Sequence, residues 1–316
     1  MNPSLNAALF HFGKHLRGNQ MYDAIGECPI CLSNERRDNV ISLQTDPDVI
    51  LLGCRHCGGV SSSKMPTEET LDEYYKSYYA KDAKKLTFHD VSRLAKHIFN
   101  SIDDTLFLKT EIIRILDFGG GDGSLAMGIG KLIGEVAVGR NVEVVLIDFN
   151  SDTSYKDGGV SLIAHKNISE VSGVFHIILA SAILEHIPKL NAIVLDLISK
   201  LSSGGYFYAR TPYVVPFKKM FKTLDFTFPA HVHDLGPSFW NQFKDTFLVD
   251  WKVIFSQSSI VETQFHEAFM RTFLAYIFKF PSRLEGQFSS RIILRPYWKY
   301  VGGWEVLFCK KEINAK

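Results

Sequence analysis

The sequence lacks long apolar runs, abundant cysteine and a charge excess of either sign. The longest apolar run, near residues 177–184, ends at Glu185 and is far shorter than the roughly 20 residues that a membrane-spanning helix needs. Residues 1–20 contain no apolar core of the kind that signal peptides carry. Lysine plus arginine number 35 and aspartate plus glutamate 34, so the net charge of +1 gives no global signature of nucleic-acid binding. Five cysteines are too few for a disulfide-dense secreted protein, and we expect a cytoplasmic chain.

Cysteine is scarce but clustered. Four of the five cysteines form two Cys-x-x-Cys pairs separated by 22 residues, whereas Cys309 stands alone and reads as a small buried apolar residue. Four thiolates close a tetrahedral Zn²⁺ site with no open position, and the metal replaces a core that about 40 residues can hardly build. The spacing therefore predicts a structural zinc ribbon over residues 25–65, in preference to a redox pair. Its ligands would be Cys28, Cys31, Cys54 and Cys57.

The charge of this ribbon argues against a nucleic-acid partner. Residues 21–65 contain four basic and six acidic side chains, a net charge of −2, and metal-bound thiolates add further negative charge. A phosphate-binding surface needs the opposite sign. We therefore do not expect nucleic acid as the partner, although a zinc-containing RNA-modifying enzyme stays an alternative.

The order of patterns predicts four segments. They are an N-terminal segment (1–24), the ribbon (25–65), a helical connector (66–110) and an α/β domain (111–316) with a helical insertion near 262–284. Thr67 offers helix-start chemistry for the connector. Four tyrosines then repeat at spacings that place them on adjacent turns of one helix face, where they would pack the ribbon onto the next domain. These are Tyr74, Tyr75, Tyr78 and Tyr79.

From residue 114 onward short apolar strands alternate with helical stretches. This alternation predicts an α/β fold with a doubly wound, mostly parallel, seven-stranded sheet. A helix is expected over 91–108 and another over 183–201. The expected strands are 115–118, 142–148, 161–164, 175–180, 205–209, 247–255 and 304–310.

A glycine-rich turn follows the first of these strands. Gly119, Gly121 and Gly123 let the backbone approach a ligand closely, and a helix starts directly after them. The spacing is G-x-G-x-G, not the G-x-G-x-x-G of dinucleotide-binding turns. Asp117, two residues before the first glycine, would repel a pyrophosphate but accept a hydrogen bond from an ammonium group.

The segment Ile115 to Leu125 resembles motif I of class I S-adenosylmethionine-dependent methyltransferases. Val144 to Asp148 is similar to the family's second strand, whose terminal acid binds the ribose hydroxyls, and Leu184-Glu185-His186 is similar to its segment after strand four. The resemblance covers about residues 95–315 and implies S-adenosylmethionine as cofactor. The cofactor-binding positions that it implies are Asp117, Gly119, Gly121, Gly123, Asp148, Asn167, Ile168 and Ala180.

The ribbon, the tyrosine-rich connector and the class I domain together resemble bacterial methyltransferases that act on sugars and surface glycans. The resemblance implies a small-molecule or glycan acceptor, and the lack of a further C-terminal domain favours O-methylation over C-methylation. A sugar C-methyltransferase and a non-catalytic cofactor-binding module stay as alternatives.

Methylation of a hydroxyl requires a general base, and histidine is the usual choice. His231 and His233 lie after the fifth predicted strand with Asp234 beside them. We expect His233 as the base, with His186 or His231 second. A metal site of His231, His233 and Asp234 and a plain helix-capping role are the alternatives.

An aromatic stretch over residues 265–280 has helical periodicity. It could be a helix packed on its own domain, a lid, a dimer face or a surface for peripheral membrane contact. The sequence does not decide among these, nor does it indicate an oligomeric state.

Overall fold

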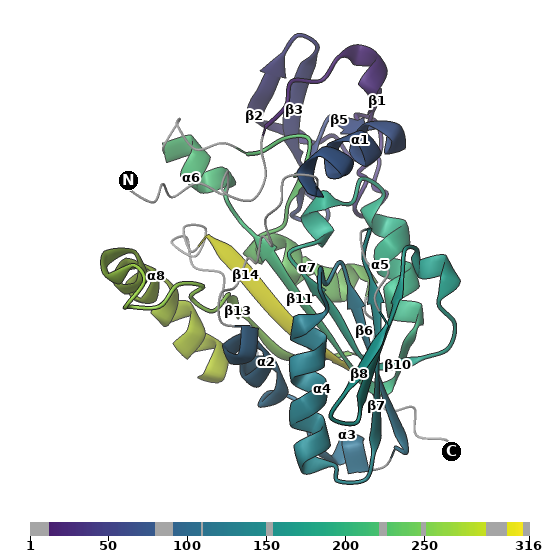
Figure 1. Ribbon diagram of the computed structural model, residues 1–316. Coiled ribbons are helices and arrows are strands. Elements are labelled where there is room, and N and C mark those ends of the chain that lie inside the picture. Colours follow the sequence, from purple (N-terminus) through teal and green to yellow (C-terminus); the bar gives the residue numbers. More distant parts are fainter. Residues whose placement is uncertain are drawn as a thin grey trace.

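The computed structural model describes residues 13–79, 91–108, 110–149, 154–220, 226–247, 251–288 and 302–311. Its centre is an eight-stranded sheet in the order β13-β14-β11-β10-β6-β7-β9-β8 (Figure 1). The strands are β6 (Ile112–Phe118), β7 (Asn141–Ile147), β8 (Tyr155–Asp157), β9 (Val160–His165), β10 (Phe175–Ser181), β11 (Leu201–Pro212), β13 (Trp251–Ser258) and β14 (Gly303–Lys310).

The predicted strand number of seven is corrected to eight, and the sheet is mixed, with four parallel and three antiparallel strand pairings. β9, β7, β6, β10 and β11 pair in parallel, whereas β8, β14 and β13 pair antiparallel with their neighbours. The additional strand, β8, is exposed at all three residues, so it has no apolar alternation that the sequence could reveal. Gly158 and Gly159, both with positive φ, make the tight turn that pairs it with β9.

Helices cover both faces of the sheet. On one face α2 (Val91–Phe99) and α4 (Ser124–Val136) pack on alternate residues of β6 such as Ile113 and Ile115. On the other face α5 (Leu190–Ser199) and α7 (Pro237–Phe247) pack on Leu116 and Phe118. Successive residues of a strand point to opposite faces, so one buried strand serves two cores. The doubly wound arrangement is the one that the alternating pattern predicts.

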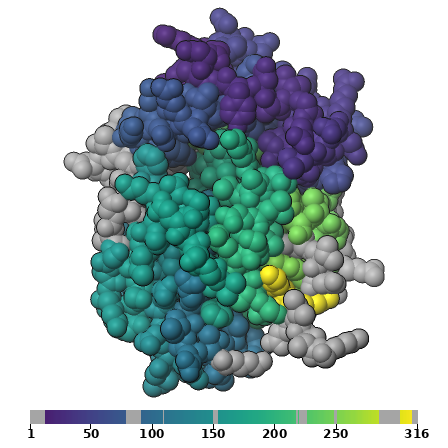
Figure 2. Space-filling view, turned by 90° about the vertical axis from the view of Figure 1, so that its right-hand side faces the viewer, coloured from purple at the N-terminus to yellow at the C-terminus, as the bar shows by residue number. Residues whose placement is uncertain are grey.

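The predicted ribbon does not stand apart from the sheet. Its strands β2 (Asp38–Thr45), β3 (Asp48–Gly53) and β4 (Val60–Ser62) form a four-stranded sheet with β12 (His233–Asp234), which comes from the other end of the chain. Cys28 and Cys57 belong to the same buried cluster as the helices α5 and α7. Figure 2 shows the N-terminal residues seated directly on the remainder of the molecule.

Short elements complete the N-terminal part. η2 (Gly18–Gln20) leads into β1 (Met21–Asp23), which pairs with β5 (Lys64–Pro66). The connector helix α1 (Glu68–Tyr79) begins where predicted, because the Thr67 hydroxyl accepts a hydrogen bond from the Thr70 amide at 3.2 Å.

Several predicted boundaries move. The helix expected over 91–108 divides into α2 and α3 (Thr105–Leu108), and the helix over 183–201 divides into η4 (Leu184–His186) and α5 because Pro188 interrupts it. The strand expected from residue 247 begins at Trp251, since α7 continues through Phe247. The remaining elements are η3 (Ile168–Glu170), α6 (Val215–Met220) and α8 (Phe269–Phe288), the helix predicted near 262–284. Among the described residues, no helix combines the length and the apolar character needed to cross a membrane.

Candidate active site

The glycine turn lies at the carboxyl end of β6, and its three predicted glycines all have left-handed backbone angles. The φ values of Gly119, Gly121 and Gly123 are 69°, 62° and 73°. At Gly119 a Cβ atom would lie 2.3 Å from the Ile183 side chain, so this position also requires glycine for space. The turn therefore brings the backbone into contact with the segment that follows β10.

Asp148 reaches the glycine turn from the next strand. It directly follows β7, and its Oδ2 accepts a hydrogen bond from the Gly121 amide at 2.9 Å. A carboxylate offers about four acceptor positions, which suits two ribose hydroxyls in addition to one amide. The residue is partly exposed. This position fits the ribose-binding role that the sequence predicts.

Asp117 lies beneath the same turn and is 1% exposed. A Cβ atom on Gly120 would lie 2.2 Å from its carboxyl group. Its Oδ2 has no hydrogen-bond partner among the described residues. Burial, with smaller contributions from the nearby Asp148 and Asp122 carboxylates, raises the pKa of Asp117 to about 7. A buried acceptor without a partner suits a cationic group of a ligand.

The other three predicted cofactor positions lie at neighbouring strand ends. Asn167 and Ile168 follow β9, and the Asn167 amide donates to Glu170 at 3.1 Å. A backbone hydrogen bond connects this end of β9 to Asp148, whose amide donates to the His165 carbonyl at 3.2 Å. Ala180 is fully buried within β10. Direct contacts of these three residues with a cofactor stay predictions.

The connector helix adds two tyrosines that the sequence did not assign to the site. The Tyr75 ring lies 6.2 Å from the ring of Phe149, the residue after the predicted ribose-binding acid. Burial raises the pKa of Tyr78, and the Asp148 carboxylate raises it further. The tyrosine repeat was visible in the sequence, but it indicated only a packing face.

His186 and His231 come together from segments that are far apart in the chain. Their ring centroids lie 4.7 Å apart. His186 Nδ1 lies 2.8 Å from the Ala230 carbonyl oxygen and 3.3 Å from the Tyr75 hydroxyl. A carbonyl can only accept, so Nδ1 is assigned the proton and Nε2 the lone pair. His231 Nδ1 contacts the Thr227 hydroxyl at 2.8 Å.

Glu185 is the third residue of the cluster that contains His186 and His231. Its side chain is 1% exposed, its Oε1 lies 3.7 Å from His186 Nε2, and its Oε2 has no hydrogen-bond partner within the described part of the chain. Burial raises the pKa of Glu185 to about 8. One ligand atom from each of Glu185, His186 and His231 lies within 4.8 Å of the other two, so the three residues could hold a divalent cation.

The structure corrects the expectation that His233 and Asp234 act together. Neighbouring residues of β12 point in opposite directions. His233 is 1% exposed, its Nε2 contacts the Ile187 carbonyl at 2.8 Å, and burial lowers its pKa to about 4. Asp234 accepts hydrogen bonds from the amides of Val214 and Val215 at the start of α6. Within the described residues Asp234 therefore does not orient His233, and His231, His233 and Asp234 do not form a metal site, whereas a role of His233 as base stays a prediction.

The four ribbon cysteines converge as the sequence predicts. Cys28 Sγ lies 3.9 Å from Cys57 Sγ, and Cys31 Sγ lies 3.7 Å from Cys54 Sγ. Tetrahedral zinc with Zn–S bonds of about 2.3 Å requires sulfur separations of about 3.8 Å, so the spacing fits zinc.

The pKa values of three of these thiols depend on contacts with one another. Hydrogen bonds from Cys31 and Cys57 lower the pKa of Cys28 to about 2. Their own contacts with Cys28 raise the pKa of Cys31 to about 12 and also raise that of Cys57. Cys28, Cys31 and Cys57 would therefore need a nearby cation to be thiolates together.

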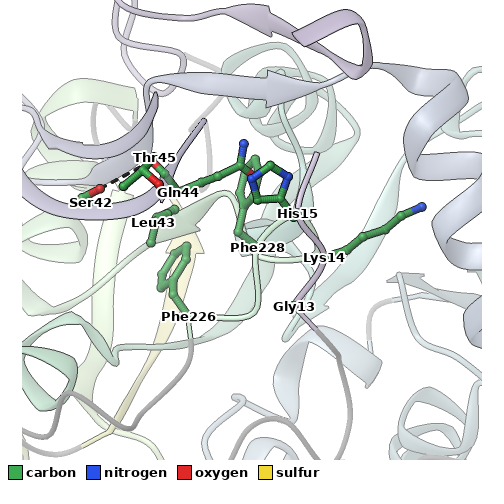
Figure 3. Close-up of a pocket in the computed structure, with 9 residues that line it drawn as sticks. All are labelled: Gly13, Lys14, His15, Ser42, Leu43, Gln44, Thr45, Phe226 and Phe228. Atoms are coloured by element: carbon green, nitrogen blue, oxygen red, sulfur yellow. Dashed lines mark hydrogen bonds between the residues drawn. The ribbon is translucent and has the colours of Figure 1, made fainter. Parts of the chain in front are cut away.

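A cavity of about 440 Å³ is lined by residues 13–15, by residues 42–45 of β2 and by Phe226 and Phe228 (Figure 3). Its aromatic wall is Phe226 and Phe228, and its polar wall includes Lys14, His15 and Gln44. The Phe226 ring lies 6.0 Å from the His231 ring. Phe226 therefore links the wall of this cavity to the histidine pair.

Comparison with known proteins assigns the family. A family model described as a methyltransferase domain matches residues 79–243, more than half of the chain. The chain belongs to this methyltransferase family. The matched region contains the glycine turn, Asp148 and the His186–His231 pair, and the protein is an S-adenosylmethionine-dependent methyltransferase. A search of curated proteins finds no match.

Two of the solved structures that this chain is similar to are methyltransferases with bound SAH. The plantazolicin methyltransferase BpumL, in complex with a monoazolic desmethylPZN analog and SAH, has a TM-score of 0.44 and 11% identity, over 77% of this chain and 92% of that one. A loganic acid methyltransferase with SAH has a TM-score of 0.38 and 8% identity, over 72% of this chain and 92% of that one.

Proposed function

We propose that this methyltransferase methylates a hydroxyl of a sugar, nucleotide sugar or glycan precursor, with His186 as general base. In this reaction the bond between sulfur and the methyl carbon breaks and a carbon–oxygen bond forms. The hydroxyl proton passes to His186 Nε2, and S-adenosylhomocysteine leaves. The observation that carries the proposal is the position of His186 three residues after Ile183, whose side chain lies against Gly119 of the cofactor turn.

The surroundings of His186 support its role as base. The Ala230 carbonyl fixes the tautomer in which Nε2 can accept a proton, and Glu185 Oε1 lies 3.7 Å from that atom. Because burial raises the pKa of Glu185 to about 8, its carboxyl group favours the imidazolium only in its ionised form. His231, whose ring lies 4.7 Å from that of His186, is the second choice. His233 also has a tautomer fixed by a carbonyl, that of Ile187, but it is 1% exposed and burial lowers its pKa to about 4, so it is the weaker base.

The sugar class of acceptor rests on the combination of ribbon, tyrosine-rich connector and class I domain. The cavity in Figure 3 is consistent with it, since aromatic and polar side chains line the cavity together, as they do in sites for polar ligands. The net charge of −2 over residues 21–65 supports a small or glycan acceptor over RNA. A cytoplasmic location stays a prediction.

Zinc in the ribbon is part of the proposal. The support is the donor set of four cysteine sulfurs and their separations of 3.7 and 3.9 Å in the two contacting pairs. Zinc in such a closed site would hold the ribbon together and take no part in methyl transfer.

The test combines a binding assay with an acceptor screen. Calorimetry with S-adenosylmethionine checks the cofactor, and transfer of labelled methyl to nucleotide sugars and glycan extracts checks the acceptor. His186→Ala should lower turnover by about 100- to 10,000-fold with little change in the cofactor Kd. His266→Ala, which changes an exposed histidine far along the chain, is the control that should keep full turnover.

Each component can fail separately. Absence of cofactor binding would overturn the proposed function, and label in RNA would overturn the acceptor class. Full turnover by His186→Ala would remove the base assignment alone. If turnover instead requires an added divalent cation and Glu185→Gln abolishes that dependence, Glu185, His186 and His231 act as metal ligands.

A further inference from the structure

Helix α8 turns its polar side to the sheet and its apolar side to solvent, the reverse of an ordinary surface helix. Thr272, Lys279 and Ser282 are 0%, 9% and 1% exposed. In contrast, eight large apolar side chains between residues 269 and 280 are 41–62% exposed. The centre of this apolar stripe, here called the α8 face, is Phe269, Met270, Phe273, Leu274, Ile277 and Phe280.

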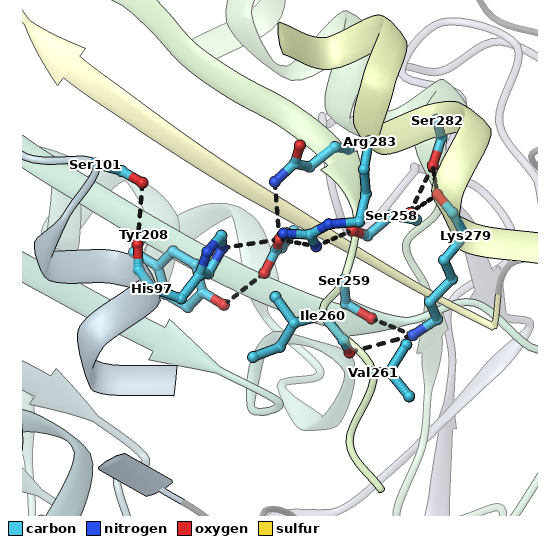
Figure 4. A network of polar contacts seen from close by, with 12 residues as sticks. His97, Ser101, Tyr208, Ser258, Ser259, Ile260, Val261, Lys279, Ser282 and Arg283 are labelled. Carbon is cyan, nitrogen blue, oxygen red and sulfur yellow. Dashed lines mark hydrogen bonds and ion pairs between the residues drawn. The ribbon is translucent and has the colours of Figure 1, made fainter. Parts of the chain in front are cut away.

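A polar network fixes α8 in this orientation (Figure 4). Ser282 Oγ donates to Ser258 Oγ at 2.5 Å, and Lys279 Nζ donates to Ser259 Oγ at 2.9 Å. Arg283 forms an ion pair of 2.9 Å with Glu305, which is fully buried. Rotating the helix to bury its apolar stripe would leave these buried charged and polar groups without partners, which is costly. The α8 face is therefore held outward.

The exposed apolar area of α8 is as large as one partner's share of a protein–protein interface. A buried aromatic side chain covers about 150–250 Å², so eight large side chains that are about half exposed present roughly 800 Å². The largest apolar patch on a typical monomer is about 300–600 Å². One partner of a standard interface contributes about 800 Å². The exposed surface matches what a stable dimer needs.

The charge distribution favours a second copy of the chain over a membrane as the partner of the α8 face. A helix that lies on a lipid surface keeps a polar face rich in lysine and arginine among the headgroups, whereas the polar face of α8 is buried against β13. Within residues 269–280 Arg271 is the single exposed charge, because Lys279 is buried. A nearly uncharged apolar stripe is self-complementary, so two copies can pack antiparallel about a two-fold axis.

The stripe is also organised before association. The rings of Phe269 and Phe273 stack with centroids 6.2 Å apart, and those of Phe265 and Tyr276 stack at 5.5 Å. Side chains that already contact one another lose less conformational freedom when a partner covers them. We propose that the α8 face is the interface of a homodimer, and this does not depend on the methyl acceptor.

The test is the mass of the zinc-loaded full chain in solution. Sedimentation equilibrium or light scattering at micromolar concentration should give twice the chain mass of 35.7 kDa. Ile277→Glu, at the centre of the α8 face, should raise the dimer Kd at least 100-fold and give monomers. Leu195→Glu is the matched control, because Leu195 on α5 is 49% exposed and Ile277 is 50% exposed. The control should stay dimeric.

Three results would overturn the proposal. The wild-type chain could be monomeric at tens of micromolar, or Ile277→Glu could stay dimeric with an unchanged unfolding temperature. The third result would be a monomeric wild-type chain that binds vesicles of phosphatidylcholine and phosphatidylglycerol, together with an Ile277→Glu variant that does not bind them. That result would assign the α8 face to a membrane. Circular dichroism of both glutamate variants checks that they are folded.

Discussion

The proposed cofactor edge (Asp117 to Asp148) and the proposed acceptor side (around His186) of this site are assembled differently. The cofactor edge draws on one stretch, from Asp117 to Asp148, and rests on backbone angles at three glycines. The acceptor side joins His186 to a carbonyl 44 residues away and to a tyrosine hydroxyl 111 residues away. A locally determined turn needs little from the rest of the fold, whereas the histidine pair exists only when several distant segments have packed.

The ribbon supports the acceptor side directly. The Val232 amide donates to the Glu185 carbonyl at 2.9 Å, and the Val232 carbonyl accepts from Ser62 of β4 at 2.8 Å. One residue therefore connects the ribbon sheet to η4. This connection means that losing the ribbon should harm the two halves of the site unequally.

Cys54→Ser should give the largest effect. Structural zinc contributes about 10 kcal/mol or more to folding in small zinc domains, and we expect loss of the metal and a marked fall in unfolding temperature. Turnover should fall further than cofactor affinity, because Ser62 and Val232 lose their fixed positions. Metal analysis, thermal unfolding and calorimetry measure the three quantities, with Cys309→Ser as the control. Equal losses of turnover and cofactor affinity would show that the two halves are not separately supported.

Gly119→Ala should disable the cofactor edge. Its Cβ atom would meet Ile183 at 2.3 Å, whereas a Cβ atom on Gly121 meets nothing within 4 Å. Both substitutions carry the left-handed backbone penalty of about 1–2 kcal/mol, so Gly121→Ala controls for it. We expect the cofactor Kd to rise at least tenfold more for Gly119→Ala than for Gly121→Ala. Similar Kd values would mean that contact with Ile183 does not shape the turn.

The pH dependence of cofactor binding should follow Asp117. Burial raises its pKa to about 7, so in the free protein the carboxyl group is largely neutral below that pH. The cofactor's ammonium group favours the ionised carboxylate, and affinity should rise about tenfold between pH 6 and 8 relative to Asp117→Asn. The stability of the free protein changes in the opposite direction. Because the pKa of Asp117 is raised in the folded state, its contribution to the free energy of unfolding is lost as the pH rises toward 7.

Calorimetric titrations of the wild type and Asp117→Asn across this pH range make the measurement. The ratio of the two affinities cancels ionisation of the cofactor itself. Parallel pH profiles for the two proteins would show that Asp117 does not contact the ammonium group.

The difference between the two halves also explains which residues the sequence could predict. Gly119, Asp148 and the four cysteines follow from local spacing, and the structure brings each group together. His231 and His233 are two residues apart, and spacing alone could not say which ring would lie against that of His186. The helical period near 262–284 predicted α8, but its outward apolar stripe depends on polar partners such as Ser258 and Glu305, which lie elsewhere in the chain.

Tyr75 contacts both halves of the site, and removal of its hydroxyl is the change for which we expect the smallest effect. Its hydroxyl lies 3.3 Å from His186 Nδ1, and its ring lies 6.2 Å from that of Phe149 on the cofactor edge. Tyr75→Phe removes only the hydroxyl, and because the Ala230 carbonyl still holds His186 at 2.8 Å, turnover should fall by about 2- to 10-fold with an unchanged cofactor Kd. Tyr75→Ala also removes the ring and should weaken cofactor binding. If Tyr75→Phe lowers turnover as much as His186→Ala does, the hydroxyl belongs to the proton-transfer machinery, and the acceptor side then begins on the connector helix.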